Sequence, residues 1–183
     1  MRVMASCPVP HGMRVLAGVY RAAGRLPTLG SLDERLRLQR EAYLFSMHPD
    51  LAEIRGLGFT MNVTGPYSPT LARAYDRLEC AARGAPRPAP GALEYAREVL
   101  GMDPARLGAV ALLAFLCEVA ENTGSLGAAD ARESAASMVV DAEVRAEVPQ
   151  ALEALRDLAA HHGLRLPGPC AGGSRPGERV PRR

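Results

Sequence analysis

The segment from Pro104 to Glu121 constrains the fold most strongly, because its centre is apolar on almost every side. It reads PARLGAVALLAFLCEVAE, and it follows Asp103. An Asp followed by Pro is typical of a helix N-terminus, where the carboxylate caps free N–H groups and Pro needs no donor. A helix that is hydrophobic all round must be covered by other elements. We therefore predict a buried central helix here.

The composition indicates which residues build the rest of the core. Of the 183 residues, 48% are hydrophobic but only 4% are aromatic, and Trp is absent. Leu, Ala and Val must therefore supply most of the buried surface. Together with helical periodicity along most of the chain, this predicts a compact, mainly α fold of about seven helices.

The other predicted helices follow from apolar residues at helical spacing and from capping signals. Ser31 with Glu34 three residues later is a capping box. Residues 59–64, FTMNVT, instead alternate apolar and polar side chains, which predicts a short strand or extended segment. The predicted helices beside the central one cover residues 13–25, 31–47, 49–56, 69–78, 92–100, 128–142 and 146–162.

A rigid corner, GPYSP, joins the extended segment to the next helix. Gly65 tolerates the backbone angles of a sharp turn, and Pro66 restricts the following one. Ser68 is a good N-cap, and Pro69 suits the first helical position. Local structure alone accounts for these residues. For Tyr67 two interpretations stay open, a packing residue or an exposed anchor.

Pro, Gly and charge mark the organisation of the chain. We predict a single helical domain over residues 1–166, with a Pro/Gly/Ala-rich linker at 82–91 that could subdivide it. Arg outnumbers acidic residues before this linker, and acidic residues dominate after it. Residues 167–183 have almost no apolar content and predict a disordered basic tail.

The cysteines and the termini indicate a cytoplasmic protein. Cys7, Cys80, Cys117 and Cys170 form no CxxC pair, so we expect reduced thiols and no zinc site of that type. The N-terminus lacks the apolar core of a signal peptide, and the longest apolar run, 107–117, is too short to cross a bilayer. We expect no membrane association.

No arrangement of residues typical of an enzyme stands out. The sequence has no GxSxG, HExxH or Walker motif, and it contains no Lys at all. His161 and His162 close a predicted helix, where a cation suits the helix dipole. We therefore predict a non-enzymatic protein with no catalytic residue, metal or cofactor.

Arginines around the corner suggest one alternative function. The order of the predicted elements is helix, short helix, extended segment, turn and helix, which loosely matches a winged-helix domain. Arginines on two of these helices could contact the phosphates of DNA. Acidic residues are interleaved with them, which weakens a positive stripe. The arginines of this alternative, a DNA-binding transcriptional regulator, are Arg35, Arg37, Arg40, Arg73 and Arg77.

Two motifs in order resemble a known family over roughly residues 13–80. RLRLQREAYLFS, with Leu38, Gln39, Tyr43 and Leu44, is similar to the KLQKLxYL helix of SocA-like Panacea antitoxins and their YwgA-like relatives. GFTMNVTGPYSPTLARAYDRL is similar to the segment that follows there, in which an extended stretch leads into GPxS and a helix. The matching residues of this second motif are Gly65, Pro66, Tyr67 and Ser68.

This resemblance implies a small, mostly helical protein-interaction module that binds a partner protein, such as a toxin or a protease component, without bond chemistry. It implies no catalytic residues, and a homo-oligomer is left open. The expected partner-binding residues are Gln39, Tyr43, Gly65, Pro66, Tyr67 and Ser68. An aromatic side chain on a preorganised turn is a common anchor, so Tyr67 is the expected contact.

Overall fold

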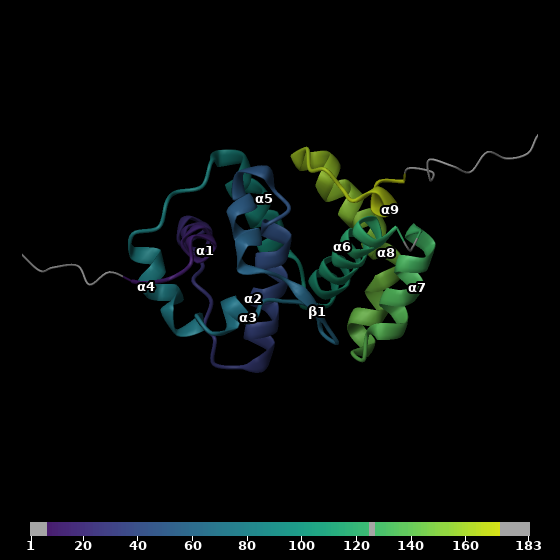
Figure 1. Ribbon diagram of the computed structural model, residues 1–183, viewed down its shortest axis with the longest axis horizontal. Coiled ribbons are helices and arrows are strands. Elements are labelled where there is room, and N and C mark those ends of the chain that lie inside the picture. The colour runs from purple at the N-terminus through teal and green to yellow at the C-terminus, as the bar shows by residue number, and fades with distance from the viewer. Residues whose placement is uncertain (1–6, 125–126, 173–183) are drawn as a thin grey trace, which may run out of the picture.

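The computed structural model describes residues 7–124 and 127–172 of the chain. It confirms the mainly helical fold with one small β element (Figure 1). The N-terminal elements are α1 (His11–Ala22), α2 (Leu32–Phe45), the 3-10 helix η1 (Pro49–Leu57), β1 (Thr60–Asn62), β2 (Gly65–Tyr67), α3 (Pro69–Ala72), the 3-10 turn η2 (Tyr75–Arg77) and α4 (Leu78–Arg83). The C-terminal elements are α5 (Pro90–Gly101), α6 (Pro104–Thr123), α7 (Ala128–Met138), α8 (Ala142–His162) and α9 (Gly168–Ala171).

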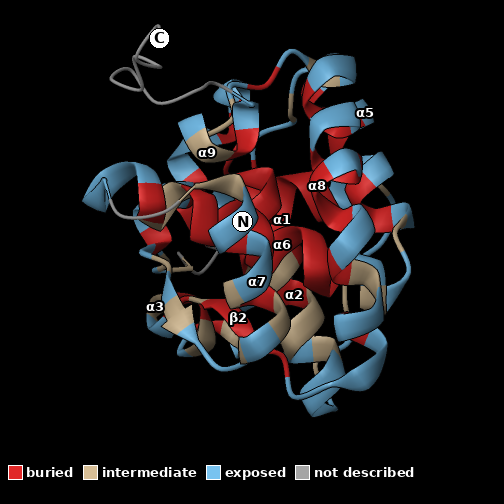
Figure 2. Ribbon diagram, turned by 90° about the vertical axis from the view of Figure 1, so that its right-hand side faces the viewer, coloured by how far each residue is buried: buried red, intermediate tan, exposed pale blue. Residues whose placement is uncertain are grey.

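Helix α6 is the centre of the fold, as its sequence predicts. Every residue from Leu107 to Cys117 is buried, and Asp103 caps the helix by accepting a hydrogen bond from the Arg106 N–H at 2.9 Å. Helix α2 packs on one side of α6, and α7, α8 and α9 pack on the other. Figure 2 shows the buried ribbon of α6 in the middle of the molecule. One core cluster therefore includes residues from both sides of the 82–91 segment.

Small residues allow α1 to lie unusually close to its neighbours. A Cβ at Gly12 would be 2.5 Å from the Glu53 carbonyl oxygen, and one at Gly18 would be 2.2 Å from the Pro86 carbonyl oxygen. Both distances are below van der Waals contact, so only Gly fits. The Pro-rich linker thus packs directly on α1, where Arg21 Nη2 also donates to the Ala85 carbonyl at 3.0 Å.

Several predicted helix ends are confirmed. Ser31 and Glu34 form the capping box, with the Ser31 N–H donating to Glu34 Oε2 at 2.9 Å and the Glu34 N–H donating to Ser31 Oγ at 3.2 Å. Gly163 ends α8 in the left-handed conformation, with φ +62°. Local sequence chemistry is sufficient at these ends because the partners lie within one helical turn.

The prediction of one continuous helix over residues 69–78 is wrong. The segment is divided into α3, the turn η2 and α4, with Ala74 between the first two in a non-helical conformation. This break brings the Tyr75 hydroxyl to 2.7 Å from Gln39 Nε2 on α2. A hydrogen bond to a residue 36 positions away is not visible in local periodicity.

The cysteines are paired in disulfides, contrary to the expected reduced thiols. Cys117 on α6 is joined to Cys170 on α9, and Cys7 is joined to Cys80 on α4. The sequence separations of 53 and 73 residues carry no local signal of pairing. Residues 168–171, which we expected in a disordered tail, form α9 beside this link, and residues 173–183 of that predicted tail lie outside the described residues.

Within the described part of the chain, no helix has both the length and the apolar character needed to cross a membrane.

Candidate partner-binding site

Gln39 and Ser68 join α2 to the start of α3. The Ser68 N–H donates to Gln39 Oε1 at 2.7 Å, and Gln39 Nε2 donates to the Ser68 carbonyl at 3.1 Å. Both residues are buried, so their polar groups depend on each other. The Gln39 side chain thus satisfies the backbone of Ser68 much as a neighbouring β-strand would.

Ser68 also serves as the predicted N-cap of α3. Its Oγ accepts from the Leu71 N–H at 3.0 Å and donates to the Leu57 carbonyl at 2.6 Å. Pro69 follows at the first helical position, as expected. The side chains of Gln39 and Ser68 are therefore fully engaged inside the protein, where they fix the direction of the chain at the corner.

The extended segment and the corner form a β-hairpin. Strand β1 pairs antiparallel with β2, with Asn62 opposite Gly65 and Thr60 opposite Tyr67. Gly65 has φ +110°, a conformation that favours Gly. Gly65 and Pro66 are buried, whereas Tyr67 is partly exposed. The hairpin places Val63 at its tip with 70% of its surface exposed.

Tyr43 lies one turn after Gln39 on α2 and contacts α6. Its hydroxyl donates to Glu118 Oε2 at 2.7 Å, and its ring packs edge-on against Phe59 and Phe115. Burial, reinforced by the Glu118 carboxylate, raises the pKa of Tyr43 well above its usual range. Tyr43 thus holds α2 on α6 and is itself buried, whereas Tyr67 is partly exposed.

An open groove lies between α2, the hairpin tip, α6 and the start of α8. Its volume is about 460 Å³, and its lining is mostly aliphatic. Val63 and Val140, the latter 85% exposed, both line it. The lining residues are Leu36, Arg40, Val63, Thr64, Gly108, Leu112, Val139, Val140, Asp141 and Val144.

Arg40 is the cationic group of this groove. Its Nη2 donates to the Thr64 carbonyl at 3.2 Å, but its Nε is buried and has no hydrogen-bond partner. Burial lowers the pKa of Arg40, and the charges of Asp141 and Asp33 oppose this shift. Among the described residues, no carboxylate forms an ion pair with Arg40. A buried donor without an acceptor is uncommon and is suited to a ligand that supplies one.

Gly108 makes room for this arrangement. A Cβ at this position of α6 would be 3.1 Å from both Arg40 Nη1 and Val144 Cγ2. Helical periodicity predicted only helix or core positions for Gly108, Val140 and Leu112. A Gly inside the central helix was the one available signal, because Gly within a helix often marks a close approach.

The arginines of the DNA-binding alternative do not form one continuous stripe. Arg37 turns inward, donating to Glu41 Oε1 at 2.7 Å and to the carbonyls of Leu100 and Met102. Arg35 is exposed and donates to the Leu29 carbonyl, and Arg77 donates to the Pro8 carbonyl. Arg73 lies exposed at the end of α3. Nucleic-acid binding stays a prediction.

Comparison with known proteins finds no matching family model, no matching curated protein and no matching solved structure.

Proposed function

We propose that this chain is a non-enzymatic protein-interaction module that binds a partner protein through the groove beside Arg40. The observation that carries the proposal is a half-buried cationic side chain whose buried Nε has no hydrogen-bond partner, set in an aliphatic groove that is open to solvent. The proposed occupant is a segment of the partner with an apolar side chain next to a carboxylate. The apolar group would fill the groove, and the carboxylate would accept from Arg40.

The rim of the groove supports a protein partner. Val63 and Val140 border the same groove and rank among the large apolar side chains that the described chain exposes. Single exposed apolar residues are common, but two that flank one aliphatic groove form the kind of patch that typically marks an interaction site. Covering both valines would exclude water around Arg40 and strengthen its hydrogen bond to a carboxylate.

The resemblance to SocA-like antitoxins and adaptors points to the same class of function. In this proposal, Gln39, Ser68, Gly65 and Pro66 act as positioning residues: they fix the hairpin that carries Val63, and Tyr67 remains a candidate contact at its base. The partner would then be a toxin or a protease component, and the mechanism would be occlusion of the partner's surface.

Native co-purification from the source cells tests this proposal. The wild-type chain is compared with Val63→Glu and Val140→Glu, which alter exposed side chains and so preserve the fold. Leu32→Glu is the matched control, because Leu32 is 69% exposed and does not line the groove. Gel filtration with absorbance at 260 and 280 nm then shows what is bound.

We expect a second polypeptide with the wild type and with Leu32→Glu, and its loss from both groove variants. If both groove variants still co-purify with the second polypeptide, the interface lies elsewhere. Excess absorbance at 260 nm that is removed by salt would favour the DNA-binding alternative. A wild-type chain that elutes alone would count against the proposal. Tyr67→Ala shows whether the base of the hairpin contributes to the interface.

A further inference from the structure

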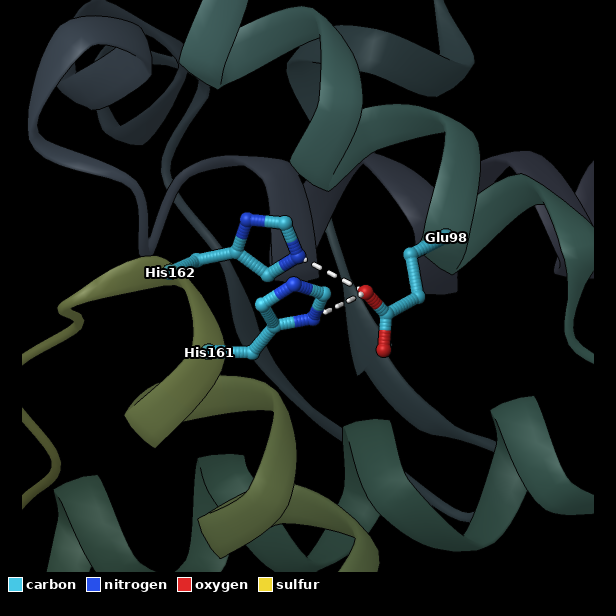
Figure 3. Close-up of side chains that lie close together, drawn as sticks. All are labelled: Glu98, His161 and His162. Carbon is cyan, nitrogen blue, oxygen red and sulfur yellow. Dashed lines mark hydrogen bonds and ion pairs between the residues drawn. The ribbon is translucent and has the colours of Figure 1, made fainter.

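Glu98, His161 and His162 converge at a place distant from the groove. Glu98 is on α5, and the two histidines form the last turn of α8. Glu98 Oε2 lies 3.1 Å from His161 Nδ1 and 2.7 Å from His162 Nε2. Figure 3 shows both rings directed at the same carboxylate oxygen. Three metal-ligating groups thus meet at one point.

The spacing of these groups is close to that of a zinc site. One nitrogen or oxygen atom from each of the three side chains lies within 4.8 Å of the others. With metal–ligand bonds of about 2.0–2.1 Å, neighbouring ligand atoms of a tetrahedral zinc ion are about 3.3 Å apart. Small side-chain rotations would therefore suffice to admit an ion among the three groups.

The cluster has one anchored ligand and two accessible ones. The His162 side chain is only 8% exposed, whereas those of His161 and Glu98 are 71% and 43% exposed. The His162 ring packs edge-on against Tyr95 at a centroid distance of 5.2 Å, and the Tyr95 hydroxyl donates to the Leu44 carbonyl at 2.6 Å. This packing fixes the His162 ring, while the exposed side lets an ion enter and leaves a coordination position for water.

The two imidazole rings also lie against each other, with centroids 4.5 Å apart. This arrangement presents one ring nitrogen of each histidine to the same carboxylate oxygen of Glu98. Imidazole and carboxylate ligands suit Zn²⁺ and its neighbours Co²⁺, Ni²⁺ and Cu²⁺.

We infer that Glu98, His161 and His162 form a binding site for a divalent transition-metal ion of the zinc class. His161 Nδ1, His162 Nε2 and the Glu98 carboxylate are its ligands, and solvent completes the coordination. A bound ion would link the C-terminal part of α5 to the end of α8. This site is independent of the groove and of its proposed partner.

The sequence pattern predicted instead that His161 and His162 cap their helix and that no metal is bound. The adjacent histidines were the visible signal. The third ligand, Glu98, lies 63 and 64 residues away and is brought in only by the packing of α5 on α8.

Zn²⁺ and Co²⁺ binding to the full chain tests the inference. The protein is purified without a histidine tag and freed of metal with a chelator. Isothermal titration gives the affinity for Zn²⁺, thermal unfolding gives the stabilisation, and the visible spectrum of Co²⁺ reports four-coordinate binding. Glu98→Gln and His161→Ala alter exposed ligands and so preserve the fold. Glu94→Gln, one turn earlier on α5, and His11→Ala are matched controls at exposed positions.

We expect one Zn²⁺ per chain, a higher unfolding temperature with Zn²⁺ and an intense visible Co²⁺ spectrum. Even outer-shell partners contribute about ten- to a hundredfold to metal affinity, so loss of a ligand should weaken Zn²⁺ binding at least tenfold. Glu94→Gln and His11→Ala should bind as the wild type does. Absence of saturable binding to the wild type, or equal binding by the ligand variants, would overturn the inference.

Discussion

At the scale of single residues, the pairing of Gln39 with Ser68 holds the corner on which the hairpin depends. Gln39→Ala would leave the buried Ser68 N–H without an acceptor and would remove one of the two hydrogen bonds to the Ser68 carbonyl, which also accepts from the Ala72 N–H. An unsatisfied buried group costs about 1–3 kcal/mol, so we expect the free energy of unfolding to fall by about 1–3 kcal/mol. Urea unfolding measures this loss.

The other glutamine of the chain is the control for this variant. Gln150 is exposed on α8, and Gln150→Ala should change the free energy of unfolding by less than about 0.5 kcal/mol. If the two variants were equally stable, the buried hydrogen bonds of Gln39 would contribute no net stability.

A second residue-scale prediction concerns Glu41, which is buried under α1. Its carboxylate accepts from the Tyr20 hydroxyl at 2.5 Å and from Arg37 Nε at 2.7 Å. Burial raises the pKa of Glu41 above its usual 4.5, although Tyr20, Arg37 and Arg25 act against this shift. The folded state therefore holds this proton more tightly than the unfolded state does.

The difference in the pKa of Glu41 between the folded and unfolded states sets the sign of the pH dependence of stability. Stabilisation from protonated Glu41 is fully present below pH 4.5 and is lost as the pH rises through the elevated folded-state pKa. Glu41→Gln should lack this component. Subtracting its unfolding free energies from those of the wild type at each pH isolates the effect, with exposed Glu153→Gln as the control. A difference that does not vary with pH would contradict the prediction.

At the scale of elements, α8 contains an internal Pro. Pro149 lies exposed within α8 and cannot donate the backbone hydrogen bond to the Arg145 carbonyl. Pro149→Ala restores this donor and removes the ring, so we expect the free energy of unfolding to rise by about 1–3 kcal/mol. Thermal and urea unfolding should both show the gain.

Pro104 provides the comparison, because it occupies the first turn of α6, where no N–H is needed. Pro104→Ala should therefore leave stability within about 0.5 kcal/mol of the wild type or lower it slightly. Equal gains from both substitutions would show that position within the helix does not govern the effect.

At the scale of the whole molecule, the Cys117–Cys170 disulfide ties the short C-terminal helix α9 to the central helix α6. The closed loop covers a separation of 53 residues, and loops of this size restrict the unfolded chain strongly. Under oxidising conditions, Cys170→Ala should lower the free energy of unfolding by about 2–4 kcal/mol.

Reduction provides the internal control, because it breaks this link in the wild type as well. In dithiothreitol the wild type and Cys170→Ala should differ only by the small effect of the side chain. Alkylation without prior reduction, followed by mass spectrometry, counts free thiols directly. A wild type that is fully alkylated and insensitive to dithiothreitol would contradict the pairing and restore the expectation of reduced cysteines.

Features whose causes are local follow from the sequence alone. The all-round apolar character of 107–117 demanded a buried helix, and Ser31, Ser68 and Asp103 marked helix starts because a cap and its N–H groups lie within one turn. The corner was also predictable, since Gly65 and Pro66 restrict their own backbone angles.

Which distant groups meet depends on the packing of the helices in three dimensions. The reduced-thiol expectation failed because pairing depends on the packing of α9 on α6, and the helix after the corner broke where Tyr75 reaches Gln39. The groove beside Arg40 and the cluster at Glu98 each join separate helices. Periodicity and spacing reflect only neighbours along the chain, whereas these contacts arise when packing around the core brings helices together.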